Sequence, residues 1–164
     1  MHCAGLEHLP FPPAEFDLLF ALDVLEHIED DAGALAELRR VSAPGAALVV
    51  TVPAHQWMWT EHDVQLHHVR RYARPEIEER ARSTGWVPET VTYFNSAVFP
   101  LVAVARLASR RSSRRGRTDL DRTPPALNRL LELPMRAEAA LIAGGVRLPF
   151  GVSLGLVCRN PARP

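Results

Sequence analysis

The chain has 164 residues, is 47% hydrophobic and carries no formal net charge, because 19 basic residues balance 19 acidic ones. This length allows one hydrophobic core, so we expect one domain with at most a loosely attached tail. The two cysteines lie near opposite ends without a Cys-x-x-Cys motif, and no apolar run approaches the roughly 20 residues of a spanning helix. These features argue against a disulfide framework, a cysteine zinc site and a membrane protein.

The first predicted element is a buried strand at 18–22, which follows a proline-rich loop. Its side chains are nearly continuously apolar, as is typical of a central strand covered on both faces. Polar side chains come directly after it, among them Asp23, Glu26 and His27. Polar groups at a strand exit can form a ligand site, or they can simply cap the next helix.

A helix and a second strand follow. Asp30 and Asp31 can cap the helix, apolar residues recur at helical spacing up to Val41, and Pro44-Gly45 is expected to end it. The aliphatic run 47–52 predicts another buried strand. Strand, helix and strand form a βαβ unit, so the two strands should be parallel and their exits, 23–27 and 53–55, should meet at one sheet edge.

The rest of the chain predicts alternating helices and strands with one basic loop. Pro134 should kink or split the last helix. In chain order we expect a helix from Arg74 to Gly85, a strand at 87–94, an apolar helix at 97–107, a flexible Arg-rich loop at 109–117, a helix at 126–142 and a strand at 151–158.

Three segments resemble the type-11 branch of the class I S-adenosylmethionine-dependent methyltransferases. They are Leu9-Pro10-Phe11 before Phe16-Asp17, the run from Asp23 to Ile28, and the run from Arg40 to Ala46. The resemblance implies an α/β, Rossmann-like three-layer sandwich that is incomplete and holds the later strands of the family's seven-stranded sheet. It implies S-adenosylmethionine as cofactor. The implied cofactor-binding residues are Leu22, Asp23, Val24 and His27.

The segment from Trp59 to Tyr72 is similar to a bacterial subgroup of that family. On this basis His68, with Asp63 five residues earlier, is the candidate catalytic base, and Arg71 and Tyr72 are candidate substrate-binding residues. The alternative is a surface loop with solvated histidines. Ligand-type side chains also crowd residues 61–68, but their spacing matches no familiar zinc helix, so we predict no metal site.

The family's glycine-rich loop is not found ahead of residue 16, and Gly5 stands where an acidic residue near the adenine is expected. We therefore expect a truncated chain or a mis-assigned start, with an exposed apolar strand edge that allows self-association. The leading hypothesis is methyl transfer to a small-molecule, lipid or glycan acceptor, without nucleic acid as a partner. The alternatives are a non-catalytic interaction module and an Arg-rich binder of membranes or nucleic acid.

The expected organisation has three parts. Residues 1–95 form a partial methyltransferase core, 96–147 form a helical insertion or lid with an Arg-rich loop at 109–122, and 148–164 form the final strand and tail. With neither a leader-like segment nor a spanning helix expected, we predict a cytoplasmic protein.

Overall fold

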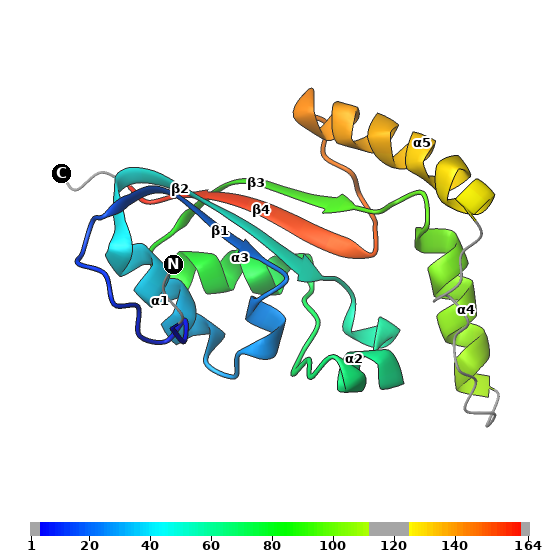
Figure 1. The fold of residues 1–164 in the computed structure, drawn as a ribbon, viewed down its shortest axis with the longest axis horizontal. Coiled ribbons are helices and arrows are strands. Elements are labelled where there is room, and N and C mark those ends of the chain that lie inside the picture. The colour runs from blue at the N-terminus through cyan, green and yellow to red at the C-terminus, as the bar shows by residue number, and fades with distance from the viewer. Residues whose placement is uncertain (1–3, 112–124, 162–164) are drawn as a thin grey trace. The chain divides into compact units, whose positions relative to one another are not determined.

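The computed structural model describes residues 4–111 and 125–161 (Figure 1). It contains two compact units. One comprises residues 1–91 with 153–164, and the other comprises 92–152. The predicted division at 95 and 147 stays a prediction, as does the role of a lid.

Strands β1 (Phe16–Leu22) and β2 (Ser42–Pro53) are parallel, in a register that pairs Leu18 with Ala47 and Leu22 with Thr51. The predicted βαβ unit is thus confirmed. One boundary was wrong, because Pro44-Gly45 lies inside β2 instead of ending the helix. Gly45 has a φ of +85°, and the register shifts between Phe16 and Leu18, so the strand accommodates the turn-forming pair through an irregularity.

Helix α1 (Asp31–Val41) connects these strands as predicted. The Asp30 side chain accepts a hydrogen bond from the backbone N–H of Gly33, which satisfies one of the free donors of the first turn. The apolar residues at helical spacing form its buried face. They are Ala34, Leu35, Leu38 and Val41.

The sheet continues with β4 (Ser153–Arg159), antiparallel to β2, and β3 (Val87–Phe94), in the order β1-β2-β4-β3. Helix α3 (Arg74–Ser83) lies with α1 on the same face of the sheet (Figure 1). Between them, the Trp86 indole N–H donates to the carbonyl of Leu35 at 2.9 Å. The predicted α/β, Rossmann-like class is confirmed, with an open sheet.

The prediction that β1 is covered on both faces was wrong for the described part of the chain. Leu19 and Ala21 are buried, whereas Leu18, Phe20 and Leu22 are 52%, 62% and 52% exposed. Side chains alternate across a strand, so these three share one face. We call them the β1 apolar strip. It leaves β1 as an edge strand with an uncovered apolar face among the described residues.

Three short helical elements follow the strand exits. They are η1 (Leu25–His27), η2 (Gln56–Met58) and α2 (Glu61–Gln65). Sequence reasoning missed α2, although Thr60 and Asp63 have the spacing of a capping box, which the structure forms. These elements place the polar residues of 23–27 and 60–72 at the carboxyl end of the parallel pair.

The second unit contains α4 (Phe99–Arg111) and α5 (Pro125–Ala143). Helix α5 is continuous through Pro134, so the expected split was wrong. Backbone N–H groups of Asn95 and Ser96 both donate to the Glu138 carboxylate. The centre of the predicted Arg-rich loop, 112–124, lies outside the described residues. Among the described helices, none is sufficiently long and apolar to cross a membrane.

Candidate active site

The exits of β1 and β2 are joined by hydrogen bonds at the carboxyl edge of the sheet. The backbone N–H of Asp23 donates to both the carbonyl and the hydroxyl of Thr51, each at 3.0 Å, and that hydroxyl donates back to the Asp23 carboxylate at 3.1 Å. Asp23 has a φ of 51°, in the left-handed region that aspartate tolerates better than most residues. The turn thereby presents an exposed carboxylate beside the half-exposed Leu22.

Element η1 comes next and carries two titratable side chains with opposite exposure. Glu26 is 1% exposed, whereas His27 is exposed. The backbone N–H of Val69 donates to the Glu26 carbonyl at 2.7 Å, which joins η1 to the segment after α2. Residues about forty positions apart therefore meet at this edge.

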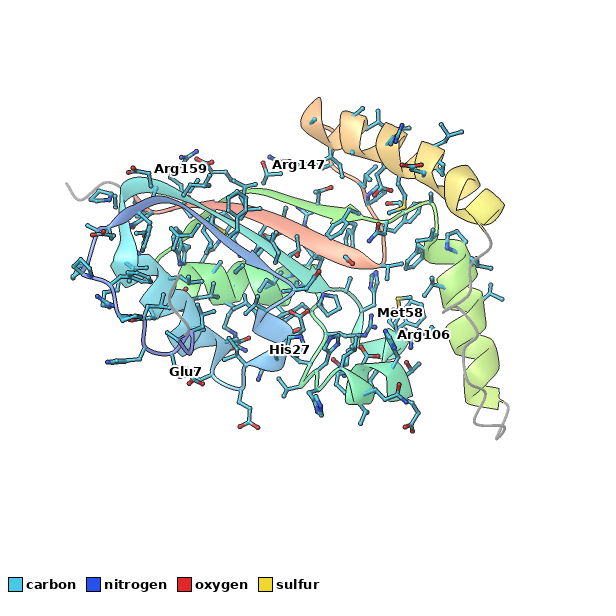
Figure 2. All side chains as sticks on the ribbon, viewed as in Figure 1. Glu7, His27, Met58, Arg106, Arg147 and Arg159 are labelled. Atoms are coloured by element: carbon cyan, nitrogen blue, oxygen red, sulfur yellow. The ribbon has the colours of Figure 1, made fainter. Side chains whose placement is uncertain are left out.

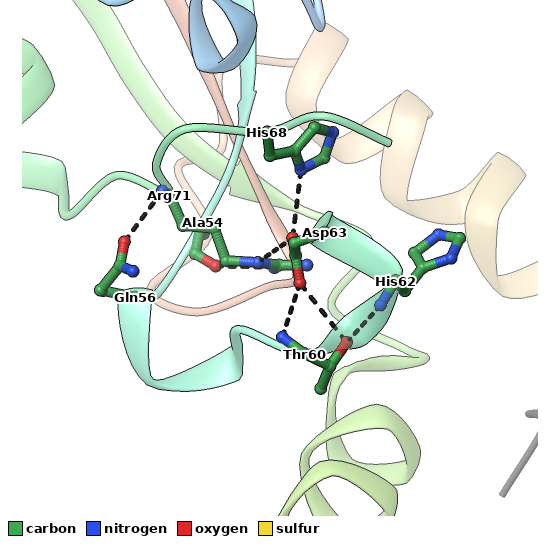
Figure 3. Close-up of polar contacts among 7 residues, drawn as sticks. All are labelled: Ala54, Gln56, Thr60, His62, Asp63, His68 and Arg71. Atoms are coloured by element: carbon green, nitrogen blue, oxygen red, sulfur yellow. Dashed lines mark hydrogen bonds and ion pairs between the residues drawn. The ribbon is translucent and has the colours of Figure 1, made fainter. Parts of the chain in front are cut away.

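Asp63 is the centre of a buried hydrogen-bond network (Figure 3). Its Oδ1 atom accepts from Arg71 Nε at 2.7 Å and lies 3.1 Å from His68 Nδ1. Its Oδ2 atom accepts from the backbone N–H of Thr60 at 2.8 Å, and Arg71 Nη1 also donates to the Ala54 carbonyl. The predicted pairing of Asp63 with His68 is present in the geometry. Its catalytic role stays a prediction.

Burial tends to raise the pKa of Asp63, but hydrogen bonds from Arg71 and Thr60 outweigh it and hold the pKa below its ordinary value. The carboxylate is therefore ionised near neutral pH and acts as an acceptor. In the neutral imidazole tautomer that donates to this carboxylate, His68 Nδ1 carries the proton and Nε2 keeps the lone pair.

Arg71 is only 6% exposed, and its backbone N–H donates to the Gln56 side chain. Its guanidinium is engaged with Asp63 and Ala54. In this arrangement Arg71 orients Asp63 and, through it, His68. A direct contact of Arg71 with substrate stays a prediction.

Tyr72 is fully buried and lies in a second network under the site. Its hydroxyl donates to Asp31 at 2.9 Å and lies 3.2 Å from the Leu25 carbonyl, and burial next to Asp31 raises its pKa. Arg70 and Arg80 also contact the Asp31 carboxylate, at 3.0 and 3.4 Å. Asp31 therefore ties α1 to α3 and to the segment after α2, and Tyr72 adds the link to η1 through Leu25. Substrate binding by Tyr72 stays a prediction.

A cluster that sequence reasoning missed consists of Glu26, His27 and His68. One ligand atom of each lies within 4.8 Å of the others, and the two imidazole rings meet edge to face at 4.8 Å. Burial raises the pKa of Glu26 to about 7, and its Oε2 atom has no hydrogen-bond partner in the described part of the chain. The Glu-His pair at 26–27 was visible in the sequence, but no local signal paired it with His68. We call these residues the Glu26 cluster.

The N-terminal part of the chain matches a known protein family. Residues 1–50 match the family described as a methyltransferase domain. This N-terminal part of the chain is therefore similar to the methyltransferase domain family. The cofactor of this family is S-adenosylmethionine, as the resemblance implied.

Two curated relatives are similar to parts of this chain. A probable S-adenosylmethionine-dependent methyltransferase of Mycolicibacterium smegmatis is 30% identical over 96 residues, which cover 57% of this chain and 37% of the relative. A malonyl-[acyl-carrier protein] O-methyltransferase of Halorhodospira halophila is 34% identical over 92 residues, covering 52% and 31%. The chain spans only about a third of the length of these relatives.

Solved structures extend the likeness of the methyltransferase fold to almost the whole chain. The [4+2]-cyclase SpnF has a TM-score of 0.56 and 21% identity, with 99% of this chain and 56% of that protein covered. Phosphoethanolamine N-methyltransferase 2 of Haemonchus contortus, solved with S-adenosyl-L-methionine, has a TM-score of 0.54 and 18% identity, with 97% and 36% covered. Because one neighbour is a cyclase, the fold alone does not fix the reaction.

Proposed function

We propose that this chain takes part in S-adenosylmethionine-dependent methyl transfer to a small-molecule, lipid or glycan acceptor that bears a hydroxyl group. The observation that carries the proposal is the parallel pairing of β1 with β2, which places the exposed Asp23 turn beside His27 and the Asp63–His68 pair at one sheet edge. Ligands of open α/β sheets bind at this edge. The family match to residues 1–50 supports the same reading.

The side chains at the β1 exit fit the chemistry of a cationic nucleoside. The Asp23 carboxylate offers an acceptor for a cation or a hydroxyl group, and the half-exposed Leu22 offers apolar surface. We propose that Leu22, Asp23, Val24 and His27 hold the cofactor, which supplies an electrophilic methyl group when bound. The Asp23 contacts to Thr51 fix the turn before any ligand arrives.

His68 is the proposed base for the acceptor. Its Nδ1 atom is committed to Asp63, so its Nε2 atom accepts the proton that the acceptor hydroxyl loses as the oxygen is methylated. Arg71 keeps Asp63 ionised and oriented. Positioning of the hydroxyl oxygen in line with the methyl group supplies the remaining acceleration.

Calorimetric titration with S-adenosylmethionine tests cofactor binding directly. Asp23→Asn should weaken binding roughly ten- to a hundredfold, because a hydrogen bond to a charged group contributes about 1.5–3 kcal/mol. Asp17→Asn is the matched control, since Asp17 is also exposed and lies at the opposite end of β1. Absence of binding, or equal affinity of both variants, would contradict the proposal for this chain.

The β1 apolar strip supports a second candidate function. The strip consists of three apolar side chains, each at least half exposed, on one face of an edge strand. Such a surface is typical of a protein–protein interface. In this reading the chain is a non-catalytic interaction module. It predicts association that is independent of the cofactor.

A further inference from the structure

The Glu26 cluster combines one carboxylate and two imidazoles in separate parts of the chain. Glu26 and His27 belong to η1, and His68 follows α2. From this geometry we propose that the cluster binds a divalent transition-metal ion of the Zn²⁺ type through Glu26, His27 and His68. Two histidines with one carboxylate are a ligand set that catalytic zinc and non-haem iron sites use.

Glu26 supplies the first independent support. A carboxylate oxygen that is buried without a hydrogen-bond partner costs free energy, and Glu26 Oε2 has none among the described residues. A bound cation would satisfy that oxygen. The neighbouring Arg71 does not hydrogen-bond to this oxygen; its Nε and Nη1 atoms donate to Asp63 and to the Ala54 carbonyl.

The surroundings of His68 supply the second support. Histidine ligands usually direct their other ring nitrogen to a carboxylate, which fixes the tautomer and the ring orientation. His68 has this arrangement, since Nδ1 lies 3.1 Å from Asp63 Oδ1 while Asp63 is itself held by Arg71 and Thr60 (Figure 3). The lone pair on Nε2 is thereby oriented before an ion binds.

The distances require only side-chain adjustment. Around tetrahedral Zn²⁺, with bonds of about 2.0–2.1 Å, ligand atoms lie roughly 3.3 Å apart. The cluster's ligand atoms lie within 4.8 Å of one another, and the exposed His27 ring contacts His68 edge to face (Figure 2). Rotation of His27 toward Glu26 can therefore close the site. Three protein ligands leave an open position.

The open position suits an acceptor hydroxyl, and this part of the inference rests on the proposed function. A metal ion lowers the pKa of a bound hydroxyl or water. When His68 binds the ion through Nε2, it no longer acts as the base; the ion would lower the pKa of the bound hydroxyl, whose proton passes to solvent water before its oxygen attacks the methyl group. Ion binding itself does not depend on methyl transfer and is measured separately.

The test uses the chain without an affinity tag, in a Cys3→Ser background, after treatment with chelator. Titration with Zn²⁺ by calorimetry and with Co²⁺ by absorption should show one ion per chain and a cobalt spectrum of low coordination number. His27→Gln and His68→Gln should each weaken binding at least tenfold. Because His27 is exposed, His27→Gln should leave the fold intact by circular dichroism.

Matched controls are His62→Gln and His67→Gln, which change exposed imidazoles of the same segment outside the cluster. They should leave the affinity unchanged. No binding by the parent chain, an affinity of the His27 and His68 variants equal to that of the parent chain, or loss of binding in the controls would each overturn the metal site. If His27→Gln weakens only S-adenosylmethionine binding, His27 is a cofactor contact and the metal site fails while the proposed function stands.

Discussion

At the residue scale, tertiary contacts change the roles that sequence reasoning gave to individual side chains. Asp31 looked like a helix cap, yet it is 1% exposed and binds Tyr72, Arg70 and Arg80. Asp30 performs the capping instead. The adjacent pair was ambiguous in sequence because either aspartate can cap a helix, and only the packing of the segment after α2 against α1 distinguishes them.

Cys158 gives a prediction at this scale. It is 1% exposed on β4, and burial raises the pKa of its thiol to about 12, above the ordinary value of 9.0. The folded state thus favours the protonated thiol, so its contribution to the free energy of unfolding is present below pH 9 and is lost as the pH rises toward 12. In a Cys3→Ser background, the remaining thiol should resist a thiol reagent at pH 8–9.

The same protein unfolded in denaturant provides the comparison for Cys158, because there the thiol has an ordinary pKa and should react fast. The measurement is the rate of colour release from a disulfide reagent under both conditions. Rapid reaction of the native chain would show that Cys158 is accessible and would contradict the packing of β4.

At the scale of elements, local signals determined most of the boundaries. Strand β3 matches its predicted bounds, and α1 matches its predicted start and buried face, because capping residues and apolar periodicity act within a few turns. The end of α1 was predicted wrongly at Pro44-Gly45. This pair lies inside β2, where a shift in the pairing register with β1 accommodates its irregular backbone. Helix α2 was missed because five residues are too few for a periodic pattern.

The cap of α1 can be tested by Asp30→Ala. Loss of the hydrogen bond to the Gly33 N–H should lower the free energy of unfolding by roughly 0.5–2 kcal/mol. Denaturant titration measures this change. Glu29→Ala, one residue earlier and exposed, is the control and should have little effect. Equal stability of the Asp30 variant and the parent chain would mean that the cap does not stabilise α1.

At the scale of the whole molecule, the β1 apolar strip is the surface feature with the clearest consequence. In the described part of the chain, Leu18, Phe20 and Leu22 face outward on an edge strand. Nearly continuous apolar character correctly indicated a strand, but the expected central position, covered on both faces, was wrong. Whether both faces of β1 are covered depends on the elements that pack against the sheet. The sequence of residues 18–22 carries no information about them.

We expect the chain by itself to self-associate through this strip, because exposed apolar edge strands pair with one another. Phe20→Glu places a charge at the centre of the β1 apolar strip, so it should shift the sedimentation profile toward monomer. Val87→Glu adds the same charge at another exposed apolar position, on β3, and should leave association unchanged. A monomeric parent chain, or equal effects of both substitutions, would show that the strip does not mediate association.

The sequence by itself determined the order of the main strands and helices, the parallel βαβ unit and the resemblance to class I methyltransferases. These properties depend on local periodicity, capping and short motifs. The parallel pairing of β1 with β2 agrees with the predicted βαβ unit. Only the tertiary structure decided that His68 meets Glu26 and His27 and that Tyr72 lies beneath them on Asp31. Those contacts join residues about forty positions apart, so they arise from packing of whole elements and leave no periodic signal in either segment.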